Sequence, residues 1–287
     1  MTISPLILQI LKNKYSWILF GFLINIFSSI IYAQSYINIS SNINEKESPF
    51  WLTSNQLGVY DKSPSIISQS FKGKNNLFKY NFIVVLNSRD FSKFYIPIAS
   101  IIKNNKNYQL KAGRWIDSLT NESILSTGSL IISKNALPIT KISLRTNEYK
   151  KFSILNFKFS IKAGISHGWM SKEKYIKAPL LHEKFLYINK SFNNQMTFRI
   201  GLVHEAMWGG ETEKHGQQSQ SLNDYLRVLT FSSGSKSSLI QEQINTLGNH
   251  LGVWDIVFSK IQKKLEFKLY YQHPFEDGSG AYQYFFD

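Results

Sequence analysis

Four short stretches in the second half of the chain combine histidine with carboxylate or amide side chains, which can bind metals, move protons or recognise sugars. The stretches are 181–184, 201–210, 243–252 and 271–278. Their polar and aromatic candidates are His182, Glu183, His204, Glu205, Trp208, Asn245, Asn249, His250, His273, Glu276 and Asp277. Three interpretations arise: a metal centre, a pair of catalytic acids, or a hydrogen-bonded network inside the fold.

A metal centre needs several imidazole or carboxylate ligands that converge on one point. The histidines at 182, 204, 250 and 273 and the glutamates at 183 and 205 could supply such ligands. No pair of them has the i, i+4 spacing of a helical site, and the set matches no familiar ligand spacing. We therefore expect no metal and no other cofactor.

Glycoside hydrolysis uses two carboxyl groups on either side of the bond that breaks. Glu205, Glu276 and Asp277 are the candidates, but Glu276 and Asp277 are adjacent and would point to opposite faces of a strand. In a turn both would be solvated. We expect no catalytic residue, and we interpret the clusters as polar networks, because buried polar groups require hydrogen-bond partners.

The first 33 residues have the layout of a secretory signal peptide. Lys12 and Lys14 precede an apolar run over 17–31, and Ala33 supplies a small residue at the expected cleavage site. A membrane anchor is the alternative, but the run is short for a transmembrane helix and contains Asn25. We therefore expect an exported protein with a cleaved signal at 1–33.

The chain has 33 Lys and Arg residues against 19 Asp and Glu residues and contains no cysteine. The missing cysteines exclude a zinc–thiolate site and a cysteine nucleophile. The lysines are scattered along the sequence, so we attribute the formal charge of +14 to composition. Contact with a polyanion remains the alternative. No nucleic-acid motif is present, and we expect no nucleic-acid partner.

Alternation of apolar and polar residues with period two recurs in segments of about ten residues, which predicts an all-β chain. In 157–165, for example, Phe157 and Phe159 alternate with Lys158 and Ser160. The candidate strands are 78–87, 93–98, 108–116, 128–134, 139–145, 157–165, 183–191, 196–202, 225–231, 251–259 and 265–272.

The pattern fits an antiparallel transmembrane β-barrel of the outer membrane better than a soluble sandwich. In such a barrel the apolar face meets lipid and the polar face lines a lumen. Aromatic residues near strand ends suit the membrane interface. These are Tyr95, Trp115, Trp169, Tyr187, Trp254 and Tyr271. We predict an irregular or helical N-terminal extension over 34–76 and a barrel domain over 77–287.

Five ordered blocks resemble the Wzi capsule-assembly family of outer-membrane proteins. They are LHEKFLYINKSF, RIGLVHEAMWGG, SLNDYLRVL, EQINTLGNHLGVWD and LEFKLYYQHPFEDGSG. Together they cover about residues 180–280, and ESPFWLTSNQLG at 47–58 and KAGRW at 111–115 are compatible with the resemblance.

The resemblance implies a non-enzymatic protein of the cell outer membrane that holds capsular or other surface polysaccharide. Its partners would be that polysaccharide and outer-membrane lipid, and we expect a monomer. Planar polar side chains would bind sugar hydroxyls and aromatic rings would contact sugar C–H groups. The residues that offer both are Trp208, Asp224, Arg227, Asn245, Asn249, His250 and Trp254.

Members of this family are longer than 287 residues, so we expect an incomplete barrel that lacks C-terminal strands. Closure of a smaller barrel by the alternating Tyr282, Tyr284 and Phe286 is the alternative. Two other functions remain open: a porin-like channel without a glycan role, and a secreted β-sandwich enzyme that acts on glycans.

Overall fold

The computed structural model describes residues 34–40, 50, 54–59, 66–74, 78–87, 94–117, 119, 126–193 and 195–276. The predicted signal peptide and Asp277 lie outside these residues. The described chain divides into two compact units. One contains residues up to 101 together with 135–137, and the other contains 102–134 and 138 onward.

The first unit is a small antiparallel sheet with the strand order β1, β2, β3 and β4. Its strands are β1 (Gln34–Ser40), β2 (Ile66–Lys74), β3 (Lys79–Asn87) and β4 (Phe94–Asn104), whose last residues belong to the second unit. Val59 and Val85 are buried and pack with Ile83 and Tyr95.

The second unit contains the longer strands, in the order β5, β6, β8, β9, β10, β13 and β14, with β7 paired to β8. All of these pairings are antiparallel. The bounds are β5 (Tyr108–Arg114), β6 (Thr140–Thr146), β7 (Lys150–Ile154), β8 (Phe157–Trp169), β9 (Leu180–Asn193), β10 (Met196–Trp208), β13 (Asn249–Gln262) and β14 (Leu265–Phe275).

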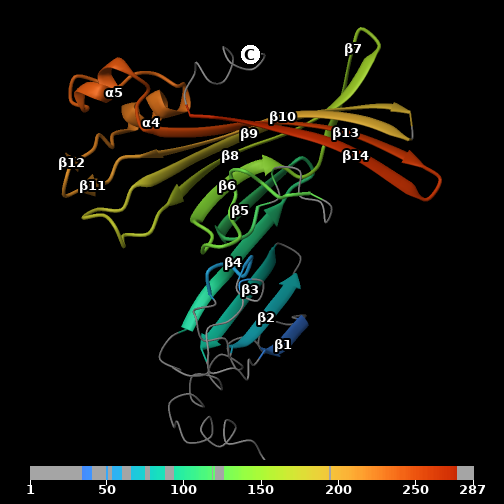
Figure 1. The fold of residues 1–287 in the computed structure, drawn as a ribbon, viewed down its shortest axis with the longest axis horizontal. Coiled ribbons are helices and arrows are strands. Elements are labelled where there is room, and N and C mark those ends of the chain that lie inside the picture. The colour runs from blue at the N-terminus through green and yellow to red at the C-terminus, as the bar shows by residue number, and fades with distance from the viewer. Residues whose placement is uncertain are drawn as a thin grey trace, which may run out of the picture. The chain divides into compact units, whose positions relative to one another are not determined.

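Short and long connections lie at opposite ends of this sheet. The turns at 105–107, 155–156 and 263–264 mark the short-turn end. The connections 170–179 and 209–248 mark the long-loop end. The second of these carries β11 (Glu211–Thr212), β12 (Gly216–Gln217), α4 (Leu222–Leu229) and α5 (Ile240–Ile244). Figure 1 shows α4 and α5 at one end of β9, β10 and β13, and the β13–β14 turn at the other.

The strand registers give the sheet two chemically different faces. The charged face carries Lys141, Arg145 and Glu183, and the apolar face carries Leu144 and Ile188. The segment between β5 and β6 covers the charged face. Residues 218–248, which we call the helical insert, cover the long-loop end of the apolar face. No helix in the described residues has the length and hydropathy needed to cross a membrane.

The all-β prediction is confirmed, and the sheet of the second unit is open, since in the described residues β14 pairs with β13 alone. Two strand predictions are wrong. Residues 225–231 belong largely to α4, which begins with a capping box between Ser221 and Asp224. Residues 128–134 form no strand, because Ser129 Oγ accepts the N–H groups of Ile131 and Ile132 in a tight turn.

The region 34–76 was expected to precede the first strands, but it contains β1 and β2, which pair with each other. Two of the predicted interfacial aromatics lie elsewhere. Trp115 and Tyr187 are buried on the charged side of the sheet. Trp169 and Tyr271, in contrast, are exposed on the apolar face.

Candidate functional site

A buried network of charged side chains occupies the middle of the charged face. β6 supplies Lys141, Ser143 and Arg145, and the registers place Ser166 of β8 and Glu183 of β9 in the row beside Ser143. These side chains share one face because every second residue of a strand points the same way. All of them are buried.

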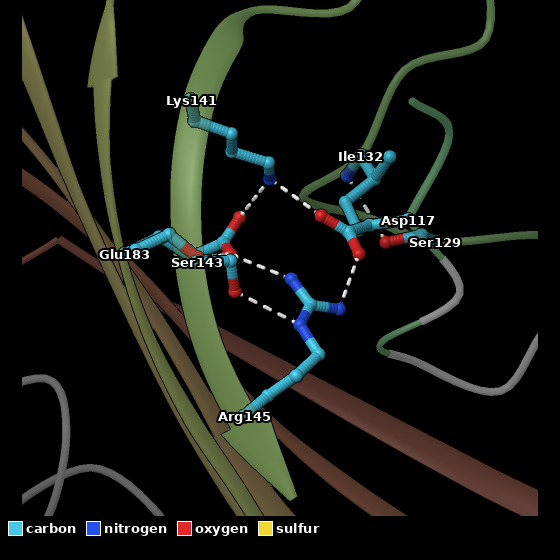
Figure 2. Close-up of polar contacts among 8 residues, drawn as sticks. Asp117, Ser129, Ile132, Lys141, Ser143, Arg145 and Glu183 are labelled. Atoms are coloured by element: carbon cyan, nitrogen blue, oxygen red, sulfur yellow. Dashed lines mark hydrogen bonds and ion pairs between the residues drawn. The ribbon is translucent and has the colours of Figure 1, made fainter. Parts of the chain in front are cut away.

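Two carboxylates and two cations are paired in this network (Figure 2). Lys141 Nζ lies 2.5 Å from Asp117 Oδ2 and 2.6 Å from Glu183 Oε2. Arg145 Nη1 donates to Asp117 Oδ1 at 2.7 Å, and its Nη2 lies 3.8 Å from Glu183 Oε1. The charges balance, so burial of the four groups does not leave an uncompensated ion.

Hydroxyl groups and an indole ring complete the network. Arg145 Nε donates to Ser143 Oγ at 2.9 Å, and Ser166 Oγ donates to Glu183 Oε1 at 2.7 Å. The Trp115 ring lies 5.2 Å from Lys141 Nζ, within the range of a cation–π contact. Trp115 therefore packs against the cations of the network.

Asp117 is the charged member of the network that does not lie on a strand. It follows β5, in the segment that crosses the charged face. Burial alone would raise the pKa of the Asp117 carboxyl, but the charges of Lys141 and Arg145 outweigh burial and hold the pKa well below its ordinary value. The carboxyl is therefore ionised at neutral pH and attaches the segment to β6.

The rest of this covering segment, described at 115–117, 119 and 126–134, is attached across the sheet. Leu119, Ile131 and Ile132 pack on Phe185 and Tyr187 of β9. At the far side, Thr127 N–H donates to the Tyr270 hydroxyl at 3.0 Å. The segment thus lies across the charged face from β6 to β14.

Three of the four predicted histidines, His182, His204 and His250, form a separate cluster on the opposite face. His204 Nε2 and His250 Nδ1 share a hydrogen bond of 2.9 Å, and His250 Nε2 donates to Leu247 O at 2.9 Å. The ring of His182 lies 6.1 Å from that of His204. Tyr225 of α4 lies above His182, with ring centroids 5.6 Å apart. The cluster joins the sheet to the helical insert.

The histidines and glutamates of the 181–184 and 201–210 stretches, which suggested shared sites, therefore lie on opposite faces of the sheet. Glu183 and Glu205 are cross-strand neighbours on the charged face, whereas His182 and His204 lie on the apolar face. Adjacent strand residues point to opposite sides, so neither His–Glu pair can act on one ligand. In the described residues no group of three or more His, Asp or Glu side chains is arranged to hold a metal.

The remaining predicted residues lie near the long-loop end. Asp224 accepts from Ser221 N–H at 2.8 Å and caps α4, and Arg227 donates to Ser233 O at 2.7 Å. Trp208 is buried and packs against Tyr225 of α4. The last group comprises Asn245 after α5, Asn249 and Trp254 on β13, His273 on β14, and Glu276 after β14. Asn245, Asn249 and Glu276 are exposed.

Apart from Glu183, the members of the charged network were not predicted as site residues. Their signal was present, since Lys141, Ser143 and Arg145 alternate with Ile142 and Leu144 in a predicted strand. Asp117 had no comparable signal, because its position in the network depends on the path of an irregular segment.

Comparison with known proteins agrees with the resemblance noted from the sequence blocks. A family model described as capsule assembly protein Wzi matches residues 85–285, which is most of the chain and all of the strands from β5 onward. No curated protein and no solved structure matches the chain. Because the match covers well over half of the chain, including the charged network, we conclude that the chain belongs to the Wzi family of capsule assembly proteins.

Proposed function

We propose that this protein is a non-enzymatic outer-membrane component of capsule assembly that retains surface polysaccharide on the cell. The Wzi family is a family of outer-membrane capsule assembly proteins, which supports the location and the general role. The retention of polysaccharide and the lack of catalysis are our proposals.

One observation carries the membrane part of the proposal. On β6 the charged residues face inward and the aliphatic residues face outward. Lys141 and Arg145 are 7% and 9% exposed, while Ile142 and Leu144 are 47% and 50% exposed. A soluble sheet buries its apolar face, so this inverted pattern supports an apolar environment outside the sheet. Lipid supplies that environment.

The same arrangement continues on the neighbouring strands. On β9, Phe185 and Tyr187 are buried against the covering segment, while Leu186 and Ile188 are exposed on the apolar face. The covering segment occupies the polar side of the sheet, which favours a closed structure over an open, porin-like channel. A secreted sandwich enzyme would have to bury Leu186 and Ile188.

We place polysaccharide contact at the long-loop end, which is the cell-surface end in barrels of this kind. Trp169 at the end of β8 is 45% exposed and contacts His167 edge-on at 5.1 Å between ring centroids. The long-loop end thus offers an exposed indole at Trp169 and exposed amides at Asn245 and Asn249, which are the types of group that contact sugars. The buried His182, His204 and Trp208 would position the helical insert.

Deletion and complementation test this function. The gene is deleted in its host, and cell-bound and released capsular polysaccharide are measured separately. Loss of the cell-bound fraction with an increase in released polymer is the expected result, and Trp169→Ala should restore retention only partly. Normal retention in the deletion strain would overturn the proposal.

A further inference from the structure

The lysines that are scattered in the sequence gather at one end of the second unit. The described residues of the short-turn end carry ten lysines and two glutamates. The β13–β14 hairpin alone supplies Lys260, Lys263, Lys264 and Lys268, with Glu266 as its acid. Within the hairpin one ion pair forms, between Lys268 Nζ and Glu266 Oε1 at 3.6 Å.

The other turns of this end add the remaining lysines. Lys150 and Lys158 lie on the β7–β8 hairpin with Lys151, and Lys190 lies near the end of β9. Lys103 lies at the end of β4, and Lys106 lies in the β4–β5 turn next to β7, since Lys150 Nζ donates to Lys106 O at 3.2 Å. The one further acid is Glu148.

The opposite end of the sheet has no comparable excess. The connections 170–179 and 209–248 together carry six lysines and arginines against five acids. The charge asymmetry therefore belongs to one end of the unit and does not follow from overall composition.

Exposed phenylalanines alternate with the lysines at the short-turn end. Phe157, Phe192 and Phe267 are each more than half exposed and lie on the apolar face, where it ends. Lys190 Nζ lies 4.1 Å from the centroid of the Phe157 ring. Aromatic rings next to lysine ammonium groups are the combination found at the boundary between acyl chains and headgroups.

We propose that the short-turn end binds the anionic phospholipid headgroups of the leaflet that surrounds it. This inference rests on the proposed membrane function and names the lipid that the protein selects. A soluble acidic polymer would be attracted by the lysines but would leave the phenylalanines of the same band in water. Anionic lipid satisfies both groups, because its phosphate meets the lysines and its acyl chain meets the rings.

Lipid selectivity tests the proposal. The full chain is reconstituted in phosphatidylcholine bilayers with trace spin-labelled phosphatidylglycerol or phosphatidylcholine, and electron paramagnetic resonance gives the fraction of each label immobilised by the protein. We expect phosphatidylglycerol to associate about fivefold more strongly at low salt, and the preference to weaken in 1 M NaCl, where the Debye length is about 3 Å.

Two matched triple variants locate the selectivity. Lys190→Gln with Lys260→Gln and Lys264→Gln should reduce the preference to less than about twofold, while Lys172→Gln with Lys174→Gln and Lys177→Gln at the other end should leave it unchanged. An unchanged fraction of immobilised phosphatidylcholine verifies that each variant has inserted.

Equal association of both lipids with the wild type, or an equal loss in both triple variants, would overturn the inference. So would binding of dextran sulfate by the detergent-solubilised wild type without any lipid preference, since that result assigns the lysines to a soluble polymer. Failure of the wild type to enter bilayers at all would instead contradict the proposed membrane function.

Discussion

The ring of Tyr187 on β9 lies directly over Gly201 on β10, its partner in the antiparallel register. A Cβ atom built on Gly201 would lie 2.0 Å from Cε1 of Tyr187. Real side chains do not approach so closely, so glycine at 201 is required by the position of the ring. The ring in turn contributes to the buried cluster under the covering segment.

Gly201→Ala should therefore lower the free energy of unfolding by about 1–3 kcal/mol, the usual cost of overpacking. The added methyl group must displace either the Tyr187 ring or the β10 backbone. Urea unfolding of the refolded protein, followed by tryptophan fluorescence, measures the change.

A double-mutant cycle shows whether the ring is the cause. In a Tyr187→Ala background the space over Gly201 is open, so the same Gly201→Ala change should cost far less. An equal cost in both backgrounds would mean that Gly201 is needed for another reason.

The same pairing occurs at two other places in the sheet. Phe185 lies over Gly164 of β8, and Phe275 lies over Gly252 of β13, each across a register pair. Cross-strand contacts between an aromatic ring and a glycine fix the register of neighbouring strands. The three pairs align β8 with β9, β9 with β10, and β13 with β14.

Asp117→Asn should destabilise the protein by about 3–5 kcal/mol, because it leaves Lys141 and Arg145 buried with a single carboxylate. Addition of Lys141→Met should recover part of the loss, since it removes the uncompensated charge. Glu173→Gln, at an exposed position in a loop, serves as the control and should change stability by less than about 0.5 kcal/mol. Urea midpoints for the four proteins measure these differences.

The stability deficit of Asp117→Asn should depend on pH in one direction. The pKa of Asp117 lies below its ordinary value, so its ionised form contributes stability above the unfolded pKa of about 3.9 and loses it as pH falls further. We expect a constant deficit from pH 8 to about pH 5 and a shrinking one below about pH 4. A deficit that already shrinks between pH 7 and pH 5 would contradict the ion pairs with Lys141 and Arg145.

Much of the second unit could be predicted from the sequence, because its strands obey a single rule of alternation. The predicted 157–165, 196–202 and 265–272 all fall within observed strands. The alternation rule failed where local hydrogen bonds compete with the backbone hydrogen bonds between strands. The Ser221–Asp224 capping box starts a helix in 225–231, and it is visible in the sequence as Ser-Leu-Asn-Asp.

The site was harder to predict, for a geometric reason. We grouped His204 with Glu205 because they are adjacent in the sequence, but adjacent residues of a strand lie on opposite faces. Asp117 and Glu183 are far apart in the sequence, and Lys141 and Arg145 bridge them in the fold. Register pairs such as Ser166 with Glu183 depend on turn lengths, which alternation alone does not determine.

The apolar face provides the most direct test of the membrane orientation. Ile188→Arg should destabilise the bilayer-inserted protein by about 2–4 kcal/mol, because it places a cation against acyl chains. Ile244→Arg, on the exposed surface of α5, is the matched control and should cost at most about 1 kcal/mol. Urea unfolding from phosphatidylcholine vesicles measures both. Both isoleucines are exposed in the fold, so equal tolerance of arginine at 188 and 244 would mean that the apolar face does not meet lipid.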